Sequence, residues 1–87
     1  MHLNGKYNLR ELGDDLVLIG EAAGADRHLV RINESAAFLW RSASGKEFST
    51  EDLASLLQGE YGIEASAALS DAASIVAAWK SSGLVAE

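Results

Sequence analysis

The chain has 87 residues, no cysteine and no proline, with 48% apolar and 23% charged side chains. This length provides for one small hydrophobic core in a single domain spanning residues 1–87, and the lack of cysteine excludes disulfide frameworks, thiolate nucleophiles and cysteine zinc sites. The net charge is −6, and residues 47–71 carry carboxylates but no lysine or arginine, which argues against nucleic acid as a partner.

Three short segments have the residue pattern of strands. Residues 6–12 mix apolar and polar side chains, residues 16–19 form a short apolar run, and residues 27–32 alternate. Gly13, Asp14 and Asp15 supply a turn between the first two segments. We therefore expect an antiparallel meander with residues 16–19 in the middle, which leaves one flank of residues 27–32 unpaired.

The first of three expected helices begins directly after the third strand. Asn33 is a favourable N-cap, and Glu34 lies where the helix dipole favours a carboxylate. Gly45 ends this helix. Phe38 points away from the apolar arc formed by Ala36, Ala37, Leu39, Trp40 and Ala43. Three interpretations of Phe38 are open. A terminal segment covers it, it is one of the exposed apolar residues that any protein has, or it contacts a partner.

The second helix is expected to begin at Ser49 or Thr50 and to end at Gly62, a position that favours a left-handed residue. The third helix is expected from about Ser66 to Gly83. Its inward side is predicted to carry Leu69, Ala72, Ala73, Ile75, Val76 and Trp79, after which residues 84–85 fold back onto the core. Its many alanines indicate either helix propensity or a shallow trough that another chain can enter.

These elements predict an α+β fold in which a three-stranded antiparallel sheet is followed by three helices, close to a winged helix-turn-helix. DNA binding is disfavoured, because the third helix carries Lys80 as its sole basic residue and opens near Glu64 and Asp71. No apolar run resembles a signal peptide or a membrane span, so we expect a cytoplasmic protein without membrane contact.

No combination of residues indicates catalysis. The histidines are His2 and His28, and neither belongs to a spacing typical of a metal site, a nucleophilic triad or a phosphate loop. We expect a protein that is not an enzyme and that has no cofactor or metal. His28 is interpreted as a structural histidine or as a pH-sensitive contact at the strand edge.

What remains is the backbone of the predicted free edge. Its N–H and C=O groups can pair with an extended peptide, whose side chains then determine specificity. Arg27 and Arg31 flank this edge, where they disfavour self-association and attract an acidic peptide.

Several motifs resemble those of a known family. Residues 33–40 read N-E-S-A-A-F-L-W, similar to the N-x-[ST]-A-A-x-[IL]-[WL] run of the PqqD family. Gly13-Asp14, Gly45 and Asp52-Leu53-Ala54 follow the family's order. Residues 71–85 are similar to its D-V-x-x-F-L-x-x-L-x-x-x-G-L-[IL] ending. The resemblance covers roughly residues 9–85.

The resemblance implies a RiPP recognition element of pyrroloquinoline quinone (PQQ) or other ribosomal-peptide biosynthesis. In that family a winged-helix domain binds the leader segment of a precursor peptide as an additional strand and presents it to a modifying enzyme, commonly a radical SAM protein. The resemblance places the peptide edge at Arg27, His28, Leu29, Val30, Arg31 and Ile32, and the cleft wall at Ala68, Ala72, Ile75, Val76 and Trp79. Ala72 replaces a bulkier valine and Trp79 a leucine, which changes the shape of the cleft.

Our leading hypothesis is a non-catalytic adaptor that binds a leader peptide by strand addition and delivers it to a modifying enzyme. The alternative is a structural or oligomerisation module in which the same edge pairs with a second copy to form a homodimer. DNA binding is a third and weaker alternative.

Overall fold

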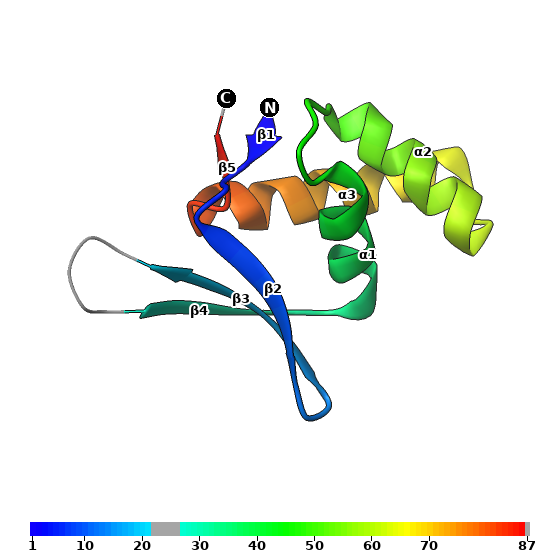
Figure 1. Ribbon diagram of the computed structural model, residues 1–87. Helices are drawn as coiled ribbons and strands as arrows, with labels where there is room; N and C mark the ends of the chain where they lie inside the picture. Colours follow the sequence, from blue (N-terminus) through cyan, green and yellow to red (C-terminus); the bar gives the residue numbers. More distant parts are fainter. Residues whose placement is uncertain (22–26, 87) are drawn as a thin grey trace.

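The computed structural model describes residues 1–21 and 27–86, in which a three-stranded antiparallel sheet is followed by three helices (Figure 1). This confirms the predicted α+β class, whereas the likeness to a winged helix stays a prediction. The strand order is β2-β3-β4. The elements are β2 (Tyr7–Leu12), β3 (Asp15–Glu21), β4 (Arg27–Ile32), α1 (Glu34–Ala43), α2 (Thr50–Tyr61) and α3 (Ala65–Ser81).

A small ribbon of two strands, absent from our prediction, joins the ends of the chain. β1 (His2–Leu3) pairs antiparallel with β5 (Val85–Ala86). Asn4 extends this contact, because its backbone N–H donates to the Leu84 carbonyl over 2.8 Å and its side-chain amide donates to the Gly83 carbonyl over 3.1 Å. Leu84 is fully buried, which confirms that the last residues fold back onto the core.

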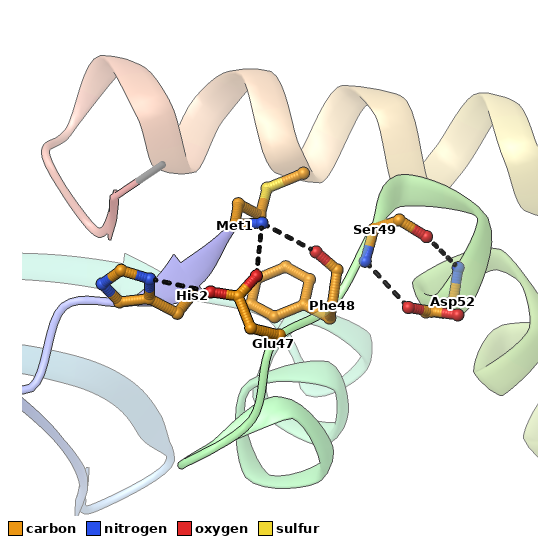
Figure 2. Close-up of polar contacts among 6 residues, drawn as sticks. All are labelled: Met1, His2, Glu47, Phe48, Ser49 and Asp52. Atoms are coloured by element: carbon orange, nitrogen blue, oxygen red, sulfur yellow. Dashed lines mark hydrogen bonds and ion pairs between the residues drawn. The ribbon is translucent and has the colours of Figure 1, made fainter.

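The N-terminal residue also contacts the loop between α1 and α2 (Figure 2). The Met1 ammonium donates to Oε2 of Glu47 over 3.3 Å and to the Phe48 carbonyl over 3.1 Å, and the Phe48 N–H donates back to the Met1 carbonyl over 2.9 Å. Nδ1 of His2 lies 3.4 Å from Oε1 of Glu47. The terminal ribbon is thus held to the loop between α1 and α2 and to the segment that follows α3.

The hydrophobic core lies among the helices. The rings of Trp40 and Trp79 meet edge to face with their centroids 5.5 Å apart. Among the buried core residues of the described chain, Leu18 is the contribution of the sheet. The others are Ala36, Leu39, Trp40, Ala43, Phe48, Leu53, Ala54, Leu57, Ala68, Ala72, Val76, Trp79 and Leu84.

The helix ends follow the predicted signals. The Asn33 side chain accepts a hydrogen bond from the Ala36 N–H over 2.9 Å. Ser49, rather than Thr50, caps α2, and it forms a reciprocal capping box with Asp52 (Figure 2). Gly62 follows α2 in the left-handed conformation, with φ of 65°.

The buried face of α3 differs from the prediction. Leu69 and Ala73, which we expected on the inward side, are exposed, and Ile75 is half-buried. The buried residues are Ala68, Ala72, Val76 and Trp79, which recur at intervals of three or four and form one narrow stripe. Leu69 and Ala73 each lie one residue, or about 100°, beyond that stripe, so they face solvent.

Candidate functional site

β4 is the edge strand of the sheet. Among the residues that the structure describes, β3 is its strand partner, and no backbone hydrogen bond from another described segment reaches residues 27–32. The open flank predicted for this segment is therefore present in the described part of the chain.

The β2–β3 hairpin determines which peptide groups of β4 face that flank. Gly13 has φ of 64° and begins a two-residue loop of the II′ kind, closed by the hydrogen-bonded pair Leu12 and Asp15. Because hydrogen-bonded and non-bonded pairs alternate along antiparallel strands, Asp15, Val17 and Ile19 bond to β2. The residues between them bond to β4, where their partners are Ile32, Val30 and His28.

The remaining residues of β4 direct their backbone N–H and C=O groups away from β3. These residues are Arg27, Leu29 and Arg31. The side chain of Leu29 is 57% exposed, and Arg31 forms an ion pair with Asp15 in which Nη2 and Oδ1 are 2.6 Å apart. That pair offsets part of the positive charge that we expected at this edge.

A groove of about 260 Å³ lies beside this edge, between β4 and the C-terminal half of α3. We call it the edge groove. Val30 and Ile32 turn their half-buried side chains toward it from the sheet. Its lining consists of Val30, Arg31, Ile32, Asn33, Ala36, Ser74, Ile75, Ala78, Trp79, Ser82 and Leu84.

The edge groove continues into a second hollow of about 550 Å³, which we call the terminal hollow. Asn33, Ser74 and Ile75 line both, so the two adjoin near the start of α1, and we refer to them together as the depression. The terminal hollow is lined by Asn33, Ser35, Leu57, Tyr61, Ile63, Asp71, Ser74 and Ile75.

The structure brings part of the predicted site together. Val30, Arg31, Ile32, Ile75 and Trp79 line the edge groove, and Leu29 flanks it through its backbone. The backbone of Arg27 and His28 lies in β4, but their side chains fall outside the described structure.

Three residues that were predicted for the cleft wall do not line the groove in the structure. Ala68, Ala72 and Val76 are buried in the core and line neither the edge groove nor the terminal hollow. Beside Ile75 and Trp79, the α3 side of the edge groove includes Ser74, Ala78 and the C-cap residue Ser82, three small residues that recur every four positions. This stripe of small side chains is the sequence signal that would have identified the wall.

Phe38 is half-buried and meets Tyr61 edge to face, with the ring centroids 6.0 Å apart. This ring contact comes from α2, and Phe38 also packs against the hydrophobic core. Phe38 also lines a polar hollow of about 460 Å³ near the β2–β3 turn, whose lining includes several carboxylates and Arg41. Nη2 of Arg41 lies 3.6 Å from Oε1 of Glu11. Its role as a partner surface stays a prediction.

The described residues contain no group of three histidine or acidic side chains placed to hold a metal ion. None of their helices is long and apolar enough to cross a membrane.

A family model described as coenzyme PQQ synthesis protein D (PqqD) matches residues 16–85. The matched range contains β3 except for its first residue, β4, the three helices and every residue that lines the edge groove and the terminal hollow. No curated protein and no solved structure matches the chain.

Proposed function

The chain belongs to the PqqD family of coenzyme PQQ synthesis proteins, and on this premise we propose that it is a non-catalytic adaptor for a precursor peptide. The leader segment of the peptide adds to the sheet as a strand beside β4. The adaptor then presents the bound peptide to a modifying enzyme, for which the family resemblance suggests a radical SAM protein.

The observation that supports this proposal is the open flank of β4 beside the edge groove. The peptide groups of Leu29 and Arg31 face this flank, where an incoming strand can pair with them. Each hydrogen bond formed in this way stabilises the complex by only about 0.5–1.5 kcal/mol, because water is displaced from both partners. The backbone therefore provides a register, and the side chains must provide much of the affinity.

The edge groove favours a peptide with apolar residues on alternate positions. Side chains along an added strand point alternately to the two faces of the sheet, so every second one enters the groove. Val30, Ile32, Ile75 and Trp79 offer it an apolar lining. The other side chains of the peptide lie on the sheet face that carries Leu29, where they stay in contact with water.

Delivery of the peptide requires a second surface that the peptide leaves uncovered. Phe38 meets this requirement, since it lines the polar hollow and neither part of the peptide-binding depression. We propose that the modifying enzyme contacts the chain around Phe38.

The test begins with a probe peptide obtained by display selection of random dodecapeptides on the immobilised chain. The strongest binder is titrated into ¹⁵N-labelled protein. We expect the largest amide shifts at Leu29, Arg31 and the edge-groove residues of α3. Shifts confined to the helical surface far from β4 would contradict the proposed site.

A proline at Leu29 provides the sharper test. Leu29→Pro removes an outward N–H and places a ring where the added strand must lie, although edge strands accept proline at such positions. We expect about tenfold weaker binding of the probe peptide, because one backbone hydrogen bond is lost and the ring obstructs its neighbours.

Leu29→Ala is the matched control for that variant, since it keeps the N–H and shortens a side chain on the other face of the sheet. Its affinity should stay within about threefold of the original chain. Equal binding by the proline and alanine variants, both shown to be folded by circular dichroism, would contradict strand addition at β4.

The alternative of pairing with a second copy uses the same flank. Molar mass measured by light scattering over a hundredfold range of protein concentration distinguishes the peptide adaptor from the oligomerisation module. A stable dimer that the probe peptide cannot dissociate would favour the oligomerisation module.

A further inference from the structure

The terminal hollow has a chemistry that the edge groove lacks. We propose that Asp71 makes it a pocket for a lysine or arginine side chain of the bound peptide, next to the apolar residues that occupy the edge groove. This inference rests on the proposed function, because the basic side chain belongs to the same peptide strand.

The shape of the terminal hollow suits a long side chain with a charged end. Leu57, Ile63 and Ile75 provide apolar lining against which an aliphatic stem can pack. Polar groups of Ser35, Tyr61, Ser74 and Asp71 share the same hollow. A carboxylate that accepts a hydrogen bond from an ammonium or guanidinium forms one of the stronger polar contacts available to a protein.

The charge of the terminal hollow is negative. Asp71 is the charged residue in its lining, no lysine or arginine lines it, and none of the ion pairs found among the described residues includes Asp71. Glu60 and Glu64 adjoin lining residues along the chain, so they add to the negative potential without entering the hollow.

The N-terminus of α1 also borders the terminal hollow, and its dipole would favour an anion. That end carries the equivalent of roughly half a positive charge. Asn33 already caps its Ala36 N–H, and Glu34 places a full negative charge in its first turn. The helix end is therefore offset locally, and the carboxylate of Asp71 determines that the hollow selects a cation.

The position of the hollow fixes where the basic residue lies in the peptide. The edge groove runs along residues 30–32 of β4, and the terminal hollow lies past Asn33, beyond the end of this strand. Every strand pair in the described residues is antiparallel. In a peptide that pairs antiparallel with β4, the basic residue therefore precedes the apolar ones.

The first experiment compares display selections of random dodecapeptides on the original chain and on Asp71→Asn. We expect the original chain to enrich lysine or arginine at a fixed distance before the alternating apolar positions. The Asp71→Asn variant should retain the apolar pattern and lose the basic residue. The same basic enrichment on both proteins would overturn the inference.

The second experiment is a double-mutant cycle with one selected peptide, in which its basic residue is replaced by glutamine. Asp71→Asn should weaken the basic peptide about two- to fivefold, as expected for a solvent-accessible ion pair, and should leave the glutamine peptide unchanged. Raising the salt concentration from 0.05 to about 0.5 M should reduce the difference.

Glu51→Gln is the matched control, because it removes one negative charge at the start of α2, outside the lining of either part of the depression. If it weakens the basic peptide as much as Asp71→Asn does, the effect comes from the net charge of the chain and the inference is wrong.

Failure of this inference can be told from failure of the proposed function. Peptides that shift the β4 amides but carry no basic preference would overturn the role of Asp71 alone. Peptides that shift no β4 amide, or the absence of any selected peptide, would overturn strand addition and the role of Asp71 together.

Discussion

The helical region and the β2–β3–β4 sheet are stabilised in different ways. Buried side chains of α1, α2 and α3 form most of the core, which includes the edge-to-face pair of Trp40 and Trp79. In the described residues the sheet contributes one fully buried side chain, Leu18, and the hairpin of β2 and β3 extends away from the helices (Figure 1). Four half-buried sheet residues also pack against the core: Tyr7, Leu9, Val30 and Ile32. Backbone hydrogen bonds hold the three strands to one another.

This difference teaches how a small domain can keep a strand edge open. Unpaired peptide groups remain hydrated at little cost, whereas exposed apolar side chains would lower stability. Because the helices carry most of the buried apolar side chains, β4 can leave one flank unpaired. α3 serves both regions, since one stripe of its residues enters the core and the neighbouring stripe lines the edge groove.

The first prediction compares two adjacent buried residues on opposite faces of β3. Leu18 is fully buried in the core, whereas Val17 is 5% exposed on the sheet face away from the helices and lies outside the core cluster. Leu18→Ala should lower the free energy of unfolding by about 2–5 kcal/mol, the usual effect of a cavity in a core. Val17→Ala should lower the free energy of unfolding by at most about 1.5 kcal/mol, because it removes two methyl groups.

Urea denaturation followed by tryptophan fluorescence measures both variants. Each should change the midpoint and leave the slope similar, since the unfolding transition involves the same surface. Equal losses of stability for the two variants would mean that the outer face of the sheet is as important as the core, and the distinction between the regions would fail.

The second prediction concerns the contact that holds β2 on β3. Gly20 lies opposite Tyr7, and a Cβ added at Gly20 would lie 2.5 Å from Cε2 of the Tyr7 ring. Gly20→Ala therefore forces the ring to move, and we expect a loss of about 1–3 kcal/mol in the free energy of unfolding.

A double variant tests whether that cost comes from the ring. When Tyr7→Ala is already present, Gly20→Ala should have little further effect, because the ring that the new methyl group would meet is gone. A cost that persists in the double variant would point to the backbone of β3 rather than to this contact.

The parts of the fold that were predictable from the sequence are those with a strong local signal. Asn33 and Ser49 are residues that cap helices, Gly62 favours a left-handed turn, and residues 27–32 alternate as a strand does. Pairing of β1 with β5 was not predictable, since two-residue strands have no periodicity and their partners are far apart in sequence.

The candidate site also has a part that was predictable from the sequence and a part that was not. The open edge followed from the strand order, which a meander of short strands determines. The wall of the edge groove followed only in part, through Ile75 and Trp79, because the side of α3 that faces β4 depends on how the helices pack. Ala72 and Val76, which the resemblance placed in the wall, are core residues, whereas Ser74 and Ala78, each two positions further along the helix, line the groove.

The third prediction has the smallest expected effect and concerns the attachment of the terminal ribbon to the helical region. The Glu47 carboxylate accepts a hydrogen bond from the Met1 ammonium, and this bond, together with the charge of the ammonium and a smaller contribution from His2, holds the pKa of Glu47 below its usual 4.5. A carboxylate with a lowered pKa stabilises the folded chain above pH 4.5, and this contribution is lost as the pH falls through the lowered value.

Thermal unfolding of the original chain and of Glu47→Gln between pH 3 and 7 measures this contribution. The original chain should be slightly more stable at pH 6, and the difference should shrink as the pH falls below 4.5, since glutamine does not titrate. Added salt should reduce the difference at pH 6, because Glu47 is exposed to solvent. A difference that is constant over the whole range would mean that the side-chain amide and the carboxylate differ in packing, and that the ribbon is held by Asn4 and by the β1–β5 pairing without help from this charge.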